Sequence, residues 1–232
     1  MSLLEVDTVN TYYGDSHILF DLSLRVEEGE VVALLGRNGS GKTTTMNTIM
    51  GVVAPRTGAV RFSGENVAGL QPFAIAKRGV QLVPDTRRIV KTITVEENLE
   101  LAAFSAPNPW PVERIYEMFP RLAQRKKSMG RALSGGEQQM LAIARALIRD
   151  SRLLLLDEPF EGLAPMIVRD LVETTKRLAS EGRTILIVEQ NVRAALLLAG
   201  RAYVLSKGQM VWEGTPAALE AEPELMHRYL GV

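Results

Sequence analysis

The segment Gly36-Arg37-Asn38-Gly39-Ser40-Gly41-Lys42-Thr43 has the residue types and spacing of a phosphate-binding loop. Glycines let backbone N–H groups turn inward around phosphate oxygens, and a helix that begins after the loop points its positive end at them. In this pattern Lys42 reaches the β- and γ-phosphates of a nucleotide, and Thr43 ligates Mg²⁺. The apolar stretch Val31–Leu35 precedes the loop, so we predict a buried strand before it and a helix over about residues 42–50 after it.

Two carboxylates, Asp157 and Glu158, follow a second short apolar run, Leu153–Leu156. At the carboxyl end of a parallel strand beside the phosphate-binding loop, Asp157 is expected to hold Mg²⁺ through its water shell. Glu158 is expected to polarise the attacking water. Many strands simply end in solvated acids, so this segment alone does not decide between the two interpretations. Its pairing with the loop at residues 36–43 favours the functional one.

A serine and two glycines in Leu133-Ser134-Gly135-Gly136-Glu137-Gln138-Gln139 stand at the start of a predicted helix that runs to about residue 149. Such a start offers the Ser134 hydroxyl and the following N–H groups to a phosphate. The seven residues, in this order, resemble the signature sequence of ABC ATPases. In that family the signature of one subunit closes over the nucleotide that the phosphate-binding loop of the other subunit holds.

This resemblance extends along nearly the whole chain and implies an ATPase of the ABC type that uses ATP and Mg²⁺. It implies that Tyr13 stacks on the adenine, although a tyrosine at a strand end needs no such role. The implied nucleotide-binding residues are Tyr13, Gly36, Asn38, Gly39, Ser40, Gly41, Lys42, Thr43, Thr44, Ser134, Gly135, Gly136 and Glu137. The implied catalytic residues are Glu158, Lys42 and Gln190, and the implied metal-binding residues are Thr43, Asp157 and Asp85.

Three positions depart from the family pattern. Asp85 stands where Gln is common, and it adds negative charge beside the phosphates, although it can still reach Mg²⁺ through water. Ala164 stands where Asp is usual, so a contact between subunits is missing. Gln190 stands where His is usual, and glutamine can hydrogen-bond the γ-phosphate but cannot titrate. More of the catalytic task is therefore expected of Glu158.

The composition agrees with a globular chain: of 232 residues, 46% are hydrophobic and 23% are charged. Lys plus Arg and Asp plus Glu number 27 each, and this balance argues against broad affinity for nucleic acid. The chain has no cysteine, which excludes disulfides and cysteine-based metal sites. Its apolar runs are far shorter than the roughly 20 residues of a membrane-spanning helix. Work at a membrane would therefore require attachment through another chain.

The remaining pattern predicts an α/β fold, namely a P-loop NTPase core of the ABC type with a mainly parallel sheet, an N-terminal antiparallel β portion and a helical insertion. We expect strands over residues 3–9, 18–26, 31–35, 60–63, 80–83, 153–156 and 184–188, and a hairpin over 202–212. We expect further helices over residues 94–104, 112–119 and 166–180. The predicted organisation is one ABC ATPase domain over residues 1–232, with a core of residues 1–85 and 151–232 and a helical subdomain of residues 86–150.

The segments Gly162-Leu163-Ala164-Pro165, Val188-Glu189-Gln190-Asn191 and Thr94-Val95-Glu96-Glu97-Asn98-Leu99 are similar to those of branched-chain amino acid importer cassettes. Cassettes of urea and short-chain amide importers are similar in much of the same sequence. The resemblance implies a peripheral motor at the cytoplasmic face of the inner membrane. Its implied partners are a second cassette, identical or different, two membrane permease subunits and, indirectly, a periplasmic solute-binding protein, with no nucleic acid. An exporter cassette, an ABC ATPase without a transport role and a regulatory nucleotide-binding module remain alternatives.

Overall fold

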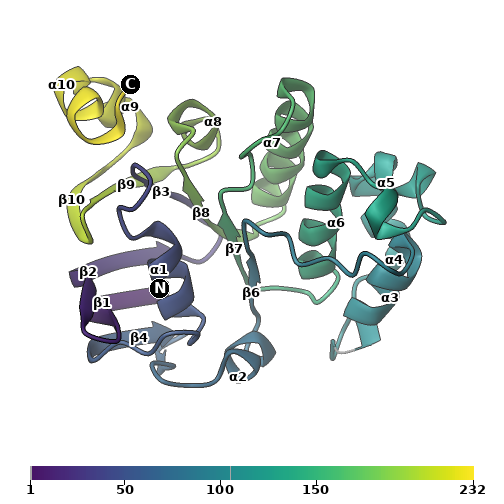
Figure 1. Ribbon diagram of the computed structural model, residues 1–232, viewed down its shortest axis with the longest axis horizontal. Helices are drawn as coiled ribbons and strands as arrows, with labels where there is room; N and C mark the ends of the chain where they lie inside the picture. Colours follow the sequence, from purple (N-terminus) through teal and green to yellow (C-terminus); the bar gives the residue numbers. More distant parts are fainter. Residues whose placement is uncertain (1, 105) are drawn as a thin grey trace.

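Two β-sheets with surrounding helices make up the part of the chain that the computed structural model describes, residues 2–104 and 106–232 (Figure 1). The strands are β1 (Ser2–Tyr13), β2 (Ser16–Glu27), β3 (Val31–Leu35), β4 (Thr57–Phe62), β5 (Glu65–Asn66), β6 (Val80–Val83), β7 (Leu153–Asp157), β8 (Thr184–Glu189), β9 (Arg201–Ser206) and β10 (Gln209–Gly214). The helices are α1 (Lys42–Ile49), α2 (Pro72–Lys77), α3 (Val95–Phe104), α4 (Val112–Met118), α5 (Pro120–Gln124), α6 (Gly135–Leu147), α7 (Pro165–Ser180), α8 (Val192–Leu196), α9 (Pro216–Glu220) and α10 (Pro223–Leu225). A turn of π-helix, Met226–Leu230, follows α10.

The larger sheet has six strands in the order β10-β9-β3-β8-β7-β6, and all but β10 pair in parallel. Every residue of β3, β7 and β8 is buried, because other elements cover both faces of these central strands. The smaller sheet is antiparallel, with the order β2-β1-β4-β5. These observations confirm the predicted α/β fold with a mainly parallel sheet and an N-terminal antiparallel portion.

Two hydrophobic cores lie on opposite faces of the larger sheet. Because alternate residues of a strand point to opposite faces, Val32 and Leu34 pack with β1, β2 and α1, whereas Ala33 and Leu35 pack with α6, α7 and α8. Helix α1 thus packs into the core that the two sheets share, as Figure 1 shows. This packing holds the loop between β3 and α1 at the carboxyl edge of the parallel strands.

Four helices, α3 to α6, lie between β6 and β7 in the chain and stand beside the sheet in Figure 1. The first begins with a capping box: the Thr94 hydroxyl accepts the Glu97 N–H at 3.2 Å, and the Glu97 carboxylate accepts the Thr94 N–H at 2.7 Å. The loop before α4 is anchored by Trp110, whose indole N–H donates to Asp150 at 2.8 Å. These helices occupy the predicted insertion, and the division of the chain into subdomains stays a prediction.

Most of the expected elements occur within a few residues of their predicted bounds. The short elements β5, α2 and α5 were not predicted, since periodicity over two to six residues carries little signal. Helix α1 ends with Met50 as its C-cap, and Gly51 takes the left-handed conformation one residue later, at φ +69°. A Cβ there would lie 2.1 Å from the backbone oxygen of Leu70, so this turn requires glycine. Across residues 2–104 and 106–232, no helix has both the length and the apolar character needed to cross a membrane.

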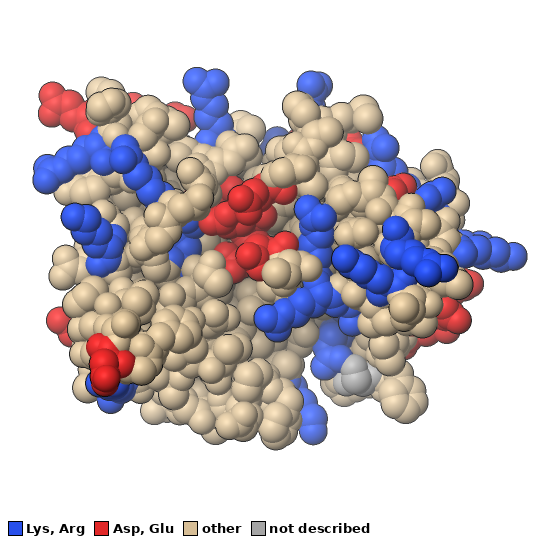
Figure 2. All heavy atoms as spheres, viewed as in Figure 1, with Lys and Arg blue, Asp and Glu red and all other residues tan. Residues whose placement is uncertain are grey.

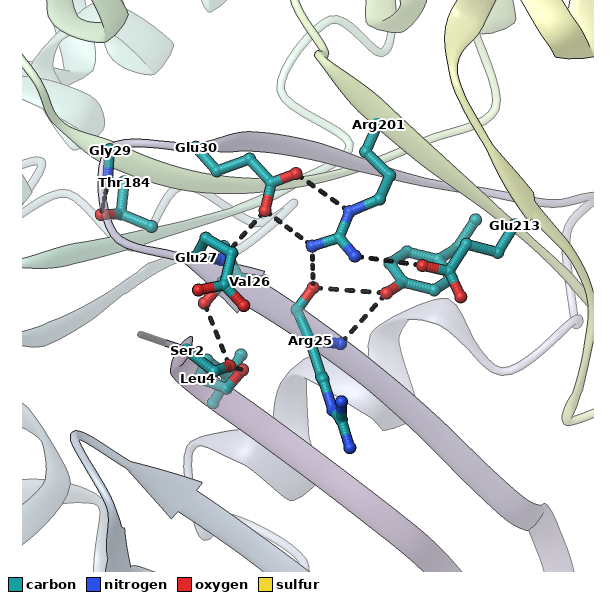
Figure 3. A network of polar contacts seen from close by, with 11 residues as sticks. Ser2, Leu4, Arg25, Val26, Glu27, Gly29, Glu30, Thr184, Arg201 and Glu213 are labelled. Carbon is teal, nitrogen blue, oxygen red and sulfur yellow. Dashed lines mark hydrogen bonds and ion pairs between the residues drawn. The ribbon is translucent and has the colours of Figure 1, made fainter.

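A polar network joins the two sheets beside the end of β2 (Figure 3). The guanidinium of Arg201 donates to both carboxylate oxygens of Glu30, at 2.9 and 2.7 Å, and to Glu213 at 3.0 Å. It also donates to the backbone oxygen of Arg25 at 3.0 Å, which ties β9 to β2. The hydrogen bonds to Glu30 raise the pKa of Arg201 and keep the guanidinium charged. The network therefore fixes the smaller sheet relative to the larger one.

Replacing Arg201 with Met is expected to destabilise the protein by about 2–3 kcal/mol, because Glu30 would keep a partly buried charge without its cation. The urea midpoint of unfolding measures this change. Lys176→Met is a matched control, since the pair of Lys176 with Glu173 lies on the exposed surface of α7 and should contribute less than about 0.5 kcal/mol. Equal midpoints for the two variants would contradict the role of the network.

Candidate active site

The predicted phosphate-binding loop lies between β3 and α1, with Gly41 as the N-cap of the helix at φ 110°. The loop is tightly folded: a Cβ on Gly36 would lie 2.5 Å from the backbone oxygen of Leu205 and from the Ser40 hydroxyl. Ser40 is 7% exposed, and its hydroxyl has no hydrogen-bond partner among the described residues. A glycine-lined cradle at a helix start, with an unsatisfied hydroxyl inside it, fits the phosphate oxygens of a nucleotide.

Lys42 is 4% exposed and folds back over this loop. Its ammonium group donates to the backbone oxygens of Gly36 at 2.9 Å and Arg37 at 3.2 Å. It also forms an ion pair with the carboxylate of Glu158, at 3.1 Å. The lysine is thus held at the mouth of the loop by groups that a phosphate can replace, since phosphate oxygens are stronger acceptors than backbone carbonyls.

The predicted acidic pair occupies the end of β7, beside the loop. The Thr43 hydroxyl donates to Asp157 at 3.4 Å, which brings the two predicted metal-binding groups together. Glu158 adopts the left-handed conformation at φ 47°, an uncommon and costly one for a residue with a Cβ. Its N–H donates to the backbone oxygen of Val188, at 2.9 Å, on the adjacent strand. This turn directs one carboxylate to Thr43 and the next to Lys42.

The carboxylate of Asp157 is held in an unfavourable environment. Burial raises its pKa from 3.8 to about 6, and the charges of Asp85 and Glu158 add to the effect, while the Thr43 hydrogen bond and Lys42 oppose it. A hydroxyl and a carboxylate are ligands that suit Mg²⁺. Among the described residues, no group of three or more His, Cys, Asp or Glu is placed to hold a metal. A Mg²⁺ ion here would therefore take its other ligands from water and nucleotide phosphates.

Asp85 is exposed in the segment after β6, and its carboxylate accepts the N–H of Thr86 at 2.6 Å. It is close enough to raise the pKa of Asp157 and of Glu161. Figure 2 shows acidic atoms gathered at the centre of this face of the molecule. Such a concentration of negative charge favours the binding of a cation.

Gln190 follows the last residue of β8 and lines a cavity of about 320 Å³ together with Glu158, Glu161 and Glu189. The glutamine and the catalytic candidate Glu158 thus line one cavity, because they follow the paired strands β8 and β7. Ala164 is the N-cap of α7 and provides no side-chain hydrogen bond to that helix. The usual acidic side chain at this position is therefore replaced by a group that can neither cap nor pair.

The signature segment forms the start of α6 as predicted. Ser134 is the N-cap, its hydroxyl accepts the N–H of Glu137 at 3.3 Å, and Glu137 accepts the N–H of Ser134 at 2.7 Å. Gly136 packs against α7, where a Cβ would lie 2.6 Å from a methyl group of Ile167. Within the described ranges, the hydrogen bonds of Ser134 and Glu137 do not reach residues 36–43. The structure therefore does not join the signature to the phosphate-binding loop of the same chain.

Tyr13 ends β1 and is 46% exposed, with its hydroxyl accepting a hydrogen bond from Asn47 of α1 at 3.3 Å. The ring thus stands free beside the helix that follows the phosphate-binding loop. The neighbouring Tyr12 stacks on His17, with ring centroids 4.0 Å apart, and Arg56 lies over its other face at 4.0 Å. This stack fixes the turn that carries Tyr13.

Two residues of the site were not predicted. Arg37 in the phosphate-binding loop donates to the backbone oxygen of His227 at 3.0 Å, which links the loop to the C-terminal turn. Glu189 ends β8 with a side chain only 2% exposed, and burial raises its pKa to about 7 although three backbone N–H groups oppose the rise. An acid at the end of the apolar run Ile185–Val188 was the available signal, because buried acids are rare. No signal in the sequence indicated the contact of Arg37, since it depends on a segment 190 residues away.

A glycine-lined loop, a lysine, a hydroxyl and two carboxylates at the carboxyl edge of a parallel sheet define a nucleotide hydrolase of the P-loop class. The family model described as "ABC transporter" matches residues 19–161. The high-affinity branched-chain amino acid transport ATP-binding protein BraG of Pseudomonas aeruginosa is 43% identical over 232 residues, which cover 99% of this chain and 100% of BraG. The lipopolysaccharide export system ATP-binding protein LptB of Haemophilus influenzae is 34% identical, covering 100% of this chain and 98% of LptB.

A solved ATP-binding cassette of an ABC transporter in its ADP conformation has the same fold, with a TM-score of 0.86 at 26% identity and 98% of both chains covered. The chain therefore belongs to the ABC transporter family, as an ATP-binding cassette. It binds ATP and hydrolyses it to drive transport.

Replacing Asp157 with Asn is expected to stabilise the protein in the absence of nucleotide and metal. A pKa raised from 3.8 to about 6 corresponds to a cost of about 3 kcal/mol for the charged form. Because 1 kcal/mol shifts Tm by about 2–4 °C in a chain of this size, Tm in EDTA at pH 7.5 should rise by several degrees. The raised pKa penalises the fold above pH 6 and not below about pH 4, so the difference should vanish in acid.

The same variant should lose most of the further rise in Tm that Mg²⁺ and ATP together produce in the unaltered protein, since bound ligands stabilise by mass action. Glu173→Gln, on the exposed surface of α7 and outside the site, serves as a control that should keep this rise. A lower Tm for Asp157→Asn in EDTA would refute the proposed electrostatic cost.

Proposed function

We propose that this chain is the ATP-hydrolysing motor of an importer for branched-chain or related amino acids, acting from the cytoplasmic face of the inner membrane through separate permease subunits. The observation that carries the hydrolytic part is the ion pair of Lys42 with Glu158 beside Asp157 and Thr43. Support for the cargo comes from the 43% identity to BraG over the whole chain. The export protein LptB, at 34% identity, keeps export open as the second candidate. A urea or short-chain amide importer is a further alternative.

In the proposed mechanism, two cassettes bind two ATP molecules between them. The N–H groups of residues 36–44 and the ammonium of Lys42 hold the phosphates, and Tyr13 stacks on the adenine. Ser134 to Glu137 of one subunit complete the site of the other, which agrees with the exposed position of Ser134. One solved relative of this fold is a dimeric cassette in a post-hydrolysis state with ADP and phosphate, at 26% identity and a TM-score of 0.81.

Hydrolysis depends on the groups at the ends of β7 and β8. Thr43, Asp157 and, through water, Asp85 would hold Mg²⁺, which would supply charge neutralisation at the phosphates. When a phosphate replaces Glu158 as the partner of Lys42, the carboxylate is released to orient and polarise the attacking water. Gln190 donates its amide N–H to the γ-phosphate without exchanging a proton. Loss of the γ-phosphate removes the bridge between subunits and resets the dimer.

A groove of about 470 Å³ between the sheet edge and the helical insertion offers a surface for a permease. Phe104 and Leu101 of α3 line it and are 92% and 50% exposed. Arg87, Arg88 and Arg145 line it as well. The Nε of Arg145 is buried without a hydrogen-bond partner in the described part of the chain. Apolar side chains beside arginines suit a permease segment that is amphipathic and carries a carboxylate.

Glu158→Gln is expected to lower ATP hydrolysis by at least about 100-fold and to leave ATP binding intact, because the amide cannot polarise water and no longer pairs with Lys42. Size-exclusion chromatography with Mg²⁺ and ATP should show a trapped dimer. Glu173→Gln, an exposed change on α7, should behave as the unaltered protein does. Full hydrolysis by Glu158→Gln would count against the assignment.

Cells in which Glu158→Gln replaces the natural chain decide between the cargo classes. Loss of radiolabelled leucine uptake, with urea uptake and outer-surface lipopolysaccharide unchanged, is the outcome expected for an amino acid importer. Loss of urea uptake alone, or a lipopolysaccharide defect alone, would replace this cargo by one of the alternatives and leave the ATPase assignment standing.

Phe104→Asp is expected to abolish the stimulation of ATP hydrolysis by co-reconstituted permeases, since an exposed apolar contact would become a buried charge in the complex. ATP binding by the isolated chain should stay unchanged, because Phe104 lies outside the hydrophobic cores. Leu197→Asp, at a position 66% exposed after α8, is the matched control. Equal stimulation of both variants would show that the groove is not the permease contact.

A further inference from the structure

Glu189 connects two loops of the active site through a single carboxylate. Its Oε1 accepts the N–H of Phe160 at 2.9 Å, in the loop that follows β7. Its Oε2 accepts the N–H groups of Gln190 at 3.1 Å and Asn191 at 3.0 Å, in the loop that precedes α8. Phe160 follows Glu158 by two residues, so the contacts join the loop of the catalytic candidate to the loop of Gln190.

The contacts leave both oxygens of the buried carboxylate hydrogen-bonded. The side chain is 2% exposed, and all three of these donors are backbone N–H groups, which make strong hydrogen bonds to a carboxylate. The nearby charge of Glu158 and burial itself both disfavour the ionised form. The four preceding residues of β8, Ile185 to Val188, are apolar and completely buried. An apolar residue at position 189 would continue that strand at lower cost, so the acid has to be explained by what it holds.

The two loops that Glu189 connects form the wall of the catalytic cavity. Glu158, Phe160, Gln190 and Asn191 all line the same space of about 320 Å³. Glu158 acts on the attacking water and Gln190 on the γ-phosphate, so their separation sets the geometry of the reaction. If the carboxylate is removed, the pairing of β7 with β8 still joins the two loops at their bases. The segments beyond the strand ends then lose the hydrogen bonds to Glu189 that connect them.

We propose that Glu189 is a positioning residue for ATP hydrolysis: it holds the Glu158 loop and the Gln190 loop at a fixed separation, and it does not contact the nucleotide. The inference rests on the proposed roles of Glu158 and Gln190. Gln190 cannot titrate, and the acid next to it, Glu189, keeps this glutamine at a fixed position relative to the carboxylate of Glu158. The expected signature is a fall in kcat with little change in KM, because ATP is held by the phosphate-binding loop and not by these loops.

Two substitutions test the link. In Glu189→Gln, one carboxylate oxygen becomes an NH₂ group that faces an N–H donor, so the bonds on one side are lost. In Glu189→Asp, the shorter side chain can still reach the adjacent N–H groups of residues 190 and 191 but not Phe160. Both variants are expected to lower kcat at least about tenfold, with KM and the dissociation constant for ATP within about twofold of the unaltered values.

Glu30→Gln is the matched control. Its carboxylate also accepts a backbone N–H, from Glu27 at 2.9 Å, and two hydrogen bonds from Arg201, but it lies in the network of Figure 3 and not in the cavity. This variant should lower Tm at least as much as the Glu189 variants and keep kcat at 25 °C. Hydrogen exchange at the Phe160 amide should become faster in Glu189→Asp and not in Glu30→Gln.

Glu158→Gln, assayed in parallel, separates failure of the positioning role of Glu189 from failure of the proposed function. Normal kcat in both Glu189 variants, with hydrolysis lost in Glu158→Gln, would overturn the inference and leave the proposed function standing. Normal kcat in all three would overturn both. A Glu189 effect that appears in KM as much as in kcat would assign Glu189 a purely structural role. A fall in kcat of Glu30→Gln in proportion to its loss of Tm would do the same.

Discussion

The site depends on the meeting of Lys42 with the acids that end β7, at the carboxyl edge of a parallel sheet. Parallel strands all end at the same edge, so the loop after β3 and the acids after β7 face one another although 114 residues separate Thr43 from Asp157. The ion pair of Lys42 with Glu158 holds the lysine inward. A phosphate that enters the loop would compete for that lysine, and in the proposed mechanism this competition releases the Glu158 carboxylate when nucleotide binds.

The site carries costs that the surrounding fold has to offset. Glu158 adopts a left-handed backbone, Asp157 keeps a raised pKa, and Glu189 is a buried acid. These features persist because β7 and its neighbour β8 are buried along their whole length, which leaves the backbone little freedom to relax. The Arg201 network contributes at a distance by fixing the second sheet, against which α1 packs. Stability elsewhere thus maintains a locally unfavourable arrangement of negative charges, which a bound cation would relieve.

Much of this arrangement was predictable, for identifiable reasons. The phosphate-binding loop, the acids at positions 157 and 158 and the signature are short motifs whose spacing is a local property of the chain. The central strands were predicted within a residue or two, since fully buried strands are continuous apolar runs. Short elements such as α2 and β5 were missed, because so few residues show no periodicity. The roles of the individual site residues, and the division into subdomains, stay predictions.

By itself, the sequence determined the chemistry available to this protein: a glycine-rich loop with a lysine and a hydroxyl, two adjacent carboxylates after a buried strand, and a Gln190 that cannot titrate. Only the tertiary structure decided how those groups are paired. The contacts of Lys42 with Glu158, of Arg37 with the C-terminal turn and of Glu189 with Phe160 all join segments distant in the chain. The physical reason is that a side chain's type is a local property, whereas its partner is selected by the packing of whole strands and helices, which no local spacing encodes.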